Sequence, residues 1–147
     1  MSSYMQGALK SGTTPSEYQN VGYALFTQTA VVTTAAAGTA TSATITVPAN
    51  CQIVDYKVDG IVDAVVGAGS ATAVAVTVGT AAAGAQYMTS TDLIAGGRAT
   101  TAITTAQAAA MDDVGSNTSV VITADPNGTI ATTQGQYRLT VVYAPKQ

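Results

Sequence analysis

Three aspartates and a lysine recur along one short stretch of the chain, and their types and spacing are those best suited to chemistry. Asp55, Asp59 and Asp63 stand four residues apart, and Lys57 lies between the first two. Spaced carboxylates can bind Ca²⁺ or act as the paired acids of a glycosidase. Along an extended strand, at about 3.3 Å per residue, these three are too spread out to close on one ion unaided. We interpret them as a solvated strand face and predict neither a metal site nor a cofactor site.

The rest of the sequence offers little for catalysis. It contains no His, so neither a Ser–His nor a Cys–His pair can form. The single Cys51 precedes an apolar run and has no His to activate it, so it is predicted to be buried and inert. The glycine-rich stretch 67–72 (GAGSAT) is not followed by the long helix of a phosphate-binding motif. We therefore expect no catalytic residues and no enzymatic activity.

The composition favours β-structure and a weakly charged surface. Ala and Thr fill more than a third of the 147 residues, whereas only 9% are charged and the formal net charge is −3. Small and β-branched side chains pack well on pleated sheets and specify helices poorly. The five Lys and Arg residues are scattered, so the clustered cations that neutralise phosphates are missing. No nucleic-acid partner is expected.

Neither a secretory signal nor a membrane span is indicated. The N-terminus lacks a charged n-region and an apolar stretch of signal-peptide length. The run 61–78 is rich in Ala and Val, but Asp63, glycines and hydroxyl side chains interrupt it, whereas a span needs about 20 mostly apolar residues. We expect a protein that is made in a cytoplasm and has no membrane partner.

Residues 1–22 are predicted to form an extended N-terminal arm, followed by a single domain at 23–147. Glycines, serines and a proline punctuate the arm, and no hydrophobic period persists in it. Spaced apolar anchors on such a segment are typical of a region that becomes ordered against a partner. The predicted partner-contact residues are Tyr4, Met5, Leu9 and Tyr18.

Beyond the arm, apolar and polar residues alternate with the period of two that marks half-buried strands. A short helix is predicted at 106–111, with Thr105 as its N-cap, and the segment 81–101 stays open between sheet and loop. Strands are predicted at 23–33, 39–47, 52–64, 71–80, 119–124 and 136–143. Strands of this length and spacing predict an all-β fold, a jelly-roll-like β-sandwich with at most one short helix.

Within 52–64 the alternation assigns a face to each residue. Val54, Tyr56, Val58 and Val62 are expected to face one way, opposite the charged residues. Gly60 falls on the apolar face, where it is expected to mark a bulge or a close backbone approach.

The domain sequence resembles small virion proteins of tailed bacteriophages, of the head-decoration or cement kind. Three segments carry the resemblance: 25–49 (LFTQTAVVTTAAAGTATSATITVPA), 77–87 (TVGTAAAGAQY) and 135–145 (GQYRLTVVYAP). The resemblance implies a compact β-domain on the capsid surface of the virion that binds the major capsid protein and stabilises the head. It also implies self-association, as a homotrimer or alternatively a homodimer.

Two other functions remain open at this point. One is a phage tail or head-fibre component that contacts the host surface. The other is a carbohydrate-binding adhesin module. Sugar sites usually need exposed aromatic side chains, and this chain has no Trp, so only its Tyr residues could serve.

Overall fold

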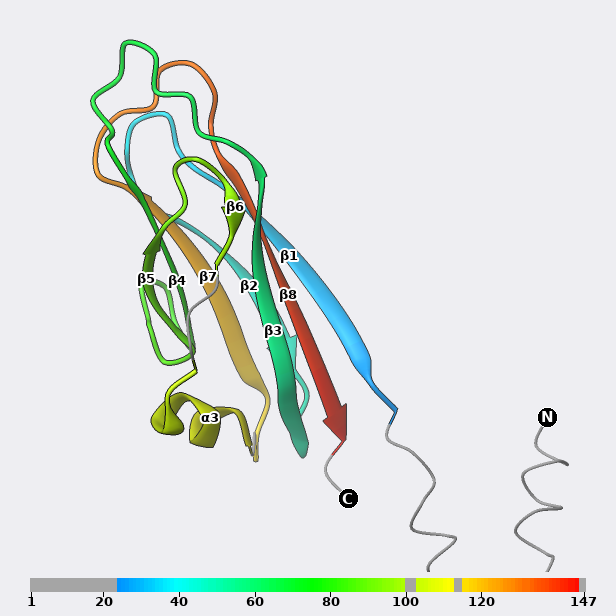
Figure 1. Ribbon diagram of the computed structural model, residues 1–147. Coiled ribbons are helices and arrows are strands. Elements are labelled where there is room, and N and C mark those ends of the chain that lie inside the picture. The colour runs from blue at the N-terminus through cyan, green and yellow to red at the C-terminus, as the bar shows by residue number, and fades with distance from the viewer. Residues whose placement is uncertain (1–23, 100–102, 113–114, 146–147) are drawn as a thin grey trace, which may run out of the picture.

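Two four-stranded antiparallel sheets lie face to face in this protein (Figure 1). The computed structural model describes residues 24–99, 103–112 and 115–145. The predicted arm 1–22, with its four anchor residues, lies outside the described residues. The elements are β1 (Phe26–Thr33), β2 (Thr41–Val47), β3 (Cys51–Val62), β4 (Val74–Gly79), β5 (Met88–Asp92), β6 (Gly97–Arg98), α3 (Thr105–Asp112), β7 (Thr118–Pro126) and β8 (Gln136–Pro145).

The strand pairing is that of one long hairpin rolled into a sandwich. β1 pairs with β8, β2 with β7, β3 with β6 and β4 with β5, all antiparallel. Rolling the hairpin adds the pairs β3–β8 and β4–β7, which complete the sheet orders β1-β8-β3-β6 and β2-β7-β4-β5. Eight strands connected in this way form a jelly roll, so the predicted all-β sandwich is confirmed.

The core lies between the sheets and is built mainly from β-branched and aromatic side chains. Along β8, Tyr137, Leu139 and Val141 are fully buried, as the period of two requires, and Cys51 is buried as predicted. The other largest fully buried side chains are Val47, Val58, Val74, Val76, Val78, Tyr87, Met88, Val120, Ile122 and Ile130. Because these residues come from both sheets, each sheet buries its inner face against the other.

β3 departs from the predicted alternation because its register against β8 shifts twice. The first shift, between Ile53 and Asp55, makes Val54 an extra residue and leaves it 48% exposed. The prediction that Val54 shares the core face with Val58 was therefore wrong, because a bulge reverses the face of the residues before it. The second shift follows Gly60 directly, where a bulge or a close approach was predicted.

The segment 81–101 contributes two short strands, β5 and β6, to opposite sheets. The end of β5 is fixed by the Asp92 carboxylate. Its Oδ1 accepts hydrogen bonds from the backbone N–H groups of Val74, at 2.9 Å, and Ile94, at 3.0 Å. The carboxylate therefore ties β5 both to β4 and to the turn that leads to β6.

Helix α3 is capped one residue earlier than predicted. The backbone N–H of Gln107 donates to Thr104 Oγ1 at 3.3 Å, and the backbone N–H of Thr104 donates to Gln107 Oε1 at 2.8 Å. This reciprocal pair is a capping box, so Thr104 and not Thr105 is the N-cap. The helix lies at the end of the sandwich where β1 begins and β8 ends (Figure 1).

Candidate functional site: the outer face of the first sheet

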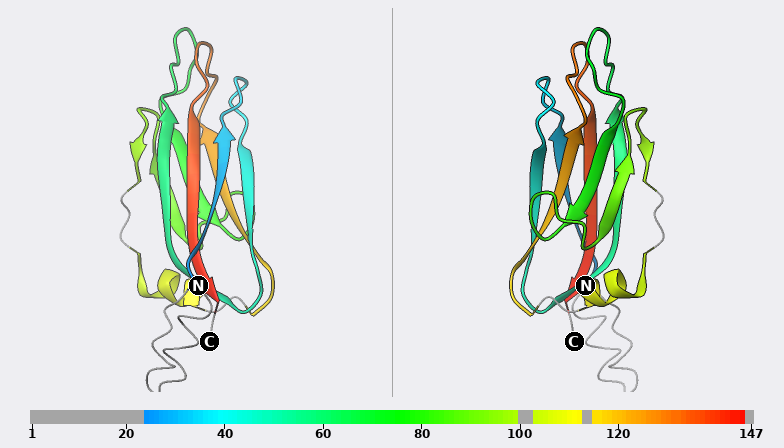
Figure 2. Two further views of the ribbon diagram at one scale, coloured as in Figure 1. Left: turned by 90° about the vertical axis from the view of Figure 1, so that its right-hand side faces the viewer. Right: turned by 90° about the vertical axis from the view of Figure 1, so that its left-hand side faces the viewer.

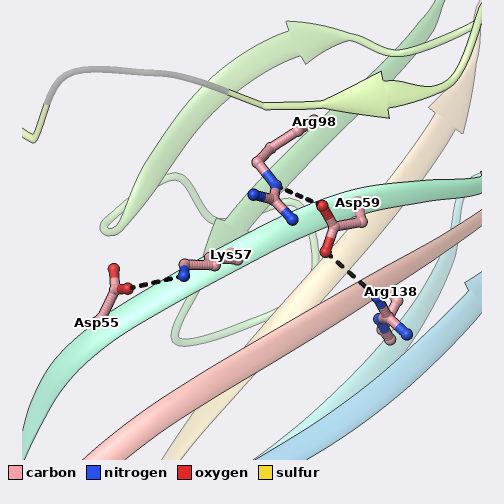
Figure 3. A network of polar contacts seen from close by, with 5 residues as sticks. All are labelled: Asp55, Lys57, Asp59, Arg98 and Arg138. Atoms are coloured by element: carbon pink, nitrogen blue, oxygen red, sulfur yellow. Dashed lines mark hydrogen bonds and ion pairs between the residues drawn. The ribbon is translucent and has the colours of Figure 1, made fainter.

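We call the sheet β1-β8-β3-β6 the first sheet and the sheet β2-β7-β4-β5 the second sheet. Charged side chains gather on the outer face of the first sheet (Figure 3). Lys57, Arg98 and Arg138 are the three cationic side chains in the described part of the chain. They come from β3, β6 and β8, and Asp55 and Asp59 of β3 accompany them. We call this set the cationic face.

The strand register places these side chains together. Asp59 pairs with Arg138 across β3 and β8, and with Arg98 across β3 and β6. Since Tyr137 and Leu139 point into the core, Arg138 must point outward, and its cross-strand partner Asp59 must do the same. Asp59 is thus flanked by an arginine on each neighbouring strand.

Asp59 is the centre of an ion-pair network. Arg98 Nε lies 2.6 Å from Asp59 Oδ1, and Arg138 Nη2 lies 3.4 Å from Asp59 Oδ2. The Asp59 side chain is only 18% exposed, whereas those of Arg98 and Arg138 are 58% and 47% exposed. The hydrogen bond from Arg98 lowers the pKa of Asp59, and Arg138 adds to this effect against the opposing influence of partial burial. The Asp59 carboxylate is therefore charged and fixed in place by the two arginines, while both guanidinium groups remain accessible to a partner.

The three aspartates that the sequence singled out are not brought together. Asp55 lies 3.8 Å from Lys57, an exposed pair of little energetic weight. Asp59 was predicted to lie on a solvated strand face, but two arginines bind it and its side chain is mostly buried. Asp63 follows the second register shift and lies against Gly96. Among residues 24–99, 103–112 and 115–145, no group of three His, Cys, Asp or Glu side chains could hold a metal ion.

The cationic face differs in charge from the rest of the chain. Its three cations and two carboxylates give it a net charge of +1, while the whole chain carries −3. Many of the other outward residues of β1 and β8 are hydroxyl or valine side chains, among them Thr27, Thr29, Val31, Thr140 and Val142. The face is therefore weakly positive and bears mostly short side chains.

The outer face of the second sheet is partly covered by the loop between β4 and β5. In that loop the backbone N–H of Ala83 donates to Thr123 Oγ1 at 2.9 Å, and Thr123 is only 2% exposed although it points outward from β7. Ser42 Oγ lies 3.0 Å from the same hydroxyl. The right-hand view of Figure 2 shows this loop crossing the sheet. The first sheet thus offers the more open face to a partner.

A hollow of about 300 Å³ lies between α3 and the start of β3. It is lined by Gln52, Ile53, Val54, Ile103, Ala108, Met111 and Asp112. Val54 and Ile103 are about half exposed there, at 48% and 45%. The lining is mostly apolar, and Asp112 is its one ionisable residue.

Comparison of the chain with protein-family models, curated proteins and solved structures finds no match. Within the described ranges, no helix is long and apolar enough to cross a membrane.

The two arginines were not predicted as part of a site. Arg98 lies 39 residues from Asp59 and Arg138 lies 79 residues away, so no local motif links them. The one available signal was the alternation of β8, which places Arg138 opposite the core-facing Tyr137 and Leu139.

Proposed function

We propose that this chain is a structural virion protein of a tailed bacteriophage, a head decoration or cement protein that binds the major capsid protein and stabilises the head. The open, weakly cationic face of the first sheet is the observation that carries the proposal. The jelly roll is an architecture of viral capsid domains and also of lectins, so the fold is compatible with the proposal without deciding it.

The chemistry of the cationic face suits attachment to another protein surface. Short hydroxyl and valine side chains let two surfaces approach closely. Asp59 neutralises part of the charge of Arg98 and Arg138, yet their exposed guanidinium groups can bind carboxylates on the capsid. Charged groups arranged in this way contribute specificity and orientation more than raw affinity. The proposed capsid surface is therefore acidic.

The arm supplies the second part of the proposed attachment. Residues 1–22 carry the anchors Tyr4, Met5, Leu9 and Tyr18, which we assign to contacts with neighbouring capsid subunits. Several weak contacts made by one oligomer add up to tight attachment, because each further contact is intramolecular. The proposal assigns the protein no catalytic role.

No observation favours the adhesin alternative over this proposal. Of the tyrosines in the described ranges, Tyr87, Tyr137 and Tyr143 are buried and Tyr56 is half-buried. Tyr56 Oη donates to the backbone carbonyl of Tyr87 at 2.6 Å. None of these four tyrosines therefore offers the exposed stacking platform that a sugar site usually requires.

Cosedimentation with expanded capsids that lack the protein tests the proposal. We expect saturable binding at a fixed ratio to the major capsid protein, and weaker, less salt-sensitive binding for the double variant Arg98→Ser, Arg138→Ser. Asp125→Ser, which removes an exposed charge on β7 of the second sheet, is the matched control and should bind like the wild type. Absence of saturable binding would overturn the cement role and direct the work to tail components and host surfaces. If the double variant binds as tightly as the wild type, the cationic face is not the surface that contacts the capsid.

A further inference from the structure

The two sides of the sandwich end in edge strands of different character. β1 and β2 lie on one side, and β5 and β6 lie on the other (Figure 2). An edge strand presents unpaired backbone groups that can pair with another chain, and proteins usually blunt such edges with charges, bulges or short strands.

The side formed by β5 and β6 is blunted. β6 has two residues, and one of them is Arg98. β5 has five residues, its register against β4 shifts between Val76 and Val78, and it ends at Asp92. Each of these features opposes the addition of a further strand.

The β1 edge carries none of these features. β1 has eight residues, FTQTAVVT, without a charge or a proline, and it pairs with β8 without a register shift. Three of its exposed or adjoining side chains are large and apolar: Leu25 is 60% exposed, Phe26 48% and Val31 49%. A long, regular, uncharged edge with exposed apolar residues is suited to pairing with another strand.

The free backbone groups of this edge can be assigned from two hydrogen bonds. The N–H of Thr34 donates to the Gly135 carbonyl at 2.9 Å, which places the even-numbered residues of β1 in the hydrogen-bonded pairs with β8. The odd-numbered residues therefore turn their N–H and C=O groups outward. The Thr33 carbonyl confirms this, because it accepts a hydrogen bond from Thr41 Oγ1 of β2 at 2.7 Å. Among the described residues, no strand pairs with the outward groups of Thr27, Thr29 and Val31.

We propose that this edge pairs antiparallel with β1 of a second copy, about a two-fold axis at Gln28. A two-fold axis brings identical sequences together, and an uncharged strand can do so without like-charge repulsion. In this register Leu25 lies opposite Val31 of the second copy, and Thr27 lies opposite Thr29. Leu25 and Val31, the two exposed apolar side chains on the outward side of this strand, thus meet each other, and the two-fold axis repeats the contact.

The neighbouring register is less suitable. With the axis at Thr29, Leu25 would face Thr33 and Val31 would face Thr27, so each apolar side chain would meet a hydroxyl. The Thr33 carbonyl, moreover, already has its partner in Thr41. Cross-strand matching of apolar side chains therefore selects the axis at Gln28.

This pairing goes beyond the proposed capsid role and does not depend on it. It joins two four-stranded sheets into one continuous sheet and sets two cationic faces side by side. It specifies a dimer, which is the alternative to the trimer among the two oligomers that the family resemblance implies. On a capsid, the dimer would double the number of attachment points.

Crosslinking of the full chain tests the register. In the proposed dimer Gln28 faces Gln28 in a non-hydrogen-bonded pair, with Cα atoms about 4.5 Å apart. This separation lies at the short end of the range that a disulfide spans. Under mild oxidation Gln28→Cys should give a covalent dimer, whereas Thr89→Cys on the blunted β5 edge should not. The native Cys51 is buried and should not interfere. Absence of the Gln28→Cys dimer would overturn the register.

Sedimentation equilibrium tests the interface itself. We expect the wild type to be a dimer, and Val31→Lys and Thr29→Pro to shift it to monomer by charging the edge or by removing one outward N–H. Thr89→Lys, on the opposite edge, should remain dimeric. Thermal unfolding of each variant checks that it is folded. A wild type that stays monomeric up to high micromolar concentration, or an oligomer that Val31→Lys leaves intact, would overturn the proposal.

Discussion

Gly60 of β3 and Gly96 of the turn before β6 pass so closely that a Cβ added to Gly60 would lie 2.5 Å from the Cα of Gly96. Gly96 has a φ of +67°, in the left-handed region that favours glycine. This contact lets β6, only two residues long, reach β3 and bring Arg98 to Asp59. The cationic face thus depends on the lack of a side chain at Gly60, where β6 passes closest to β3.

Gly60→Ala should displace β6 and loosen the Arg98–Asp59 pair. An extra methyl group against backbone that cannot yield costs about 1–3 kcal/mol in the free energy of unfolding. Urea unfolding measures this loss. Gly115→Ala is the matched control, because a Cβ there would meet nothing within 4 Å, and its effect should stay within about 0.5 kcal/mol. Equal effects of the two variants would contradict the role of the close approach.

Asp59→Asn should change the acid stability of the fold. The pKa of Asp59 is lowered in the folded state, chiefly by Arg98, relative to about 3.9 in the unfolded chain. Its contribution to stability is therefore fully present above about pH 4 and is lost as the pH falls through the folded-state pKa. The wild type should be more stable than the variant at pH 7, and this difference should shrink at lower pH.

Urea titrations at pH 7, 4 and 3 measure that difference. A background of Arg98→Gln with Arg138→Gln supplies the control, because Asp59 then has no cationic partner among the residues shown in Figure 3 other than Lys57. If Asp59→Asn destabilises the background as much as it does the wild type, the network does not stabilise the fold.

Tyr137→Phe should improve stability at high pH. Tyr137 is fully buried and its hydroxyl has no hydrogen-bond partner within the described ranges. Burial raises its pKa to about 12, with smaller contributions from Asp92 and Asp63. The unfolded chain loses this proton near pH 10, so the stability of the wild type falls between about pH 10 and 12.

The phenylalanine variant lacks this ionisation and should lose less stability over that interval. At pH 7 it should be neutral or slightly stabilising, because it removes a buried polar atom that lacks a partner. Thermal unfolding at pH 7, 10 and 11 checks both expectations. A clear loss of stability at pH 7 would indicate that the hydroxyl has a partner, such as a bound water.

The alternation of apolar residues was sufficient to predict most of the strands and the sandwich. It succeeds in β8, where Tyr137 and Leu139 are buried and Arg138 points outward. It fails at the start of β3 because the bulge at Val54 depends on pairing with a distant strand, and no residue type marks that bulge in the way that Gly60 marks the second shift. Val54 is apolar and follows the pattern, yet the register shift leaves it outside.

The candidate site could be predicted only in part, for a related reason. Asp59 was singled out, but its partners are supplied by β6 and β8, far along the chain. The two residues of β6 are too few to show any periodicity. Thr104 was missed as the helix cap because Thr105 beside it has an equally suitable side chain, and only the hydrogen bonds to Gln107 distinguish them.

Thr104→Ala should destabilise α3, because it removes the hydroxyl that accepts the N–H of Gln107. The loss of an N-cap costs about 0.5–2 kcal/mol. Thr105→Ala is the matched control, since it adds a good helix former without removing the cap. Hydrogen exchange at the Gln107 and Ala108 amides should speed up in the first variant only. Faster exchange in Thr105→Ala alone would restore the original assignment of the cap.

Deletion of residues 1–22 should leave the jelly roll folded and weaken its attachment to capsids. The buried residues of the sandwich described here run from Val32 to Ala144, so the core can form without the arm. The truncated chain should keep its melting temperature and its sedimentation behaviour, because the β1 edge is retained. Its binding in capsid cosedimentation should fall by tenfold or more, since each lost contact in a multivalent attachment lowers the apparent affinity of the whole.

A full-length variant with serine at all four anchors separates their contribution from that of chain length; those anchors are Tyr4, Met5, Leu9 and Tyr18. Unchanged binding of both variants would remove the arm from the proposed attachment and leave the cationic face as its sole basis.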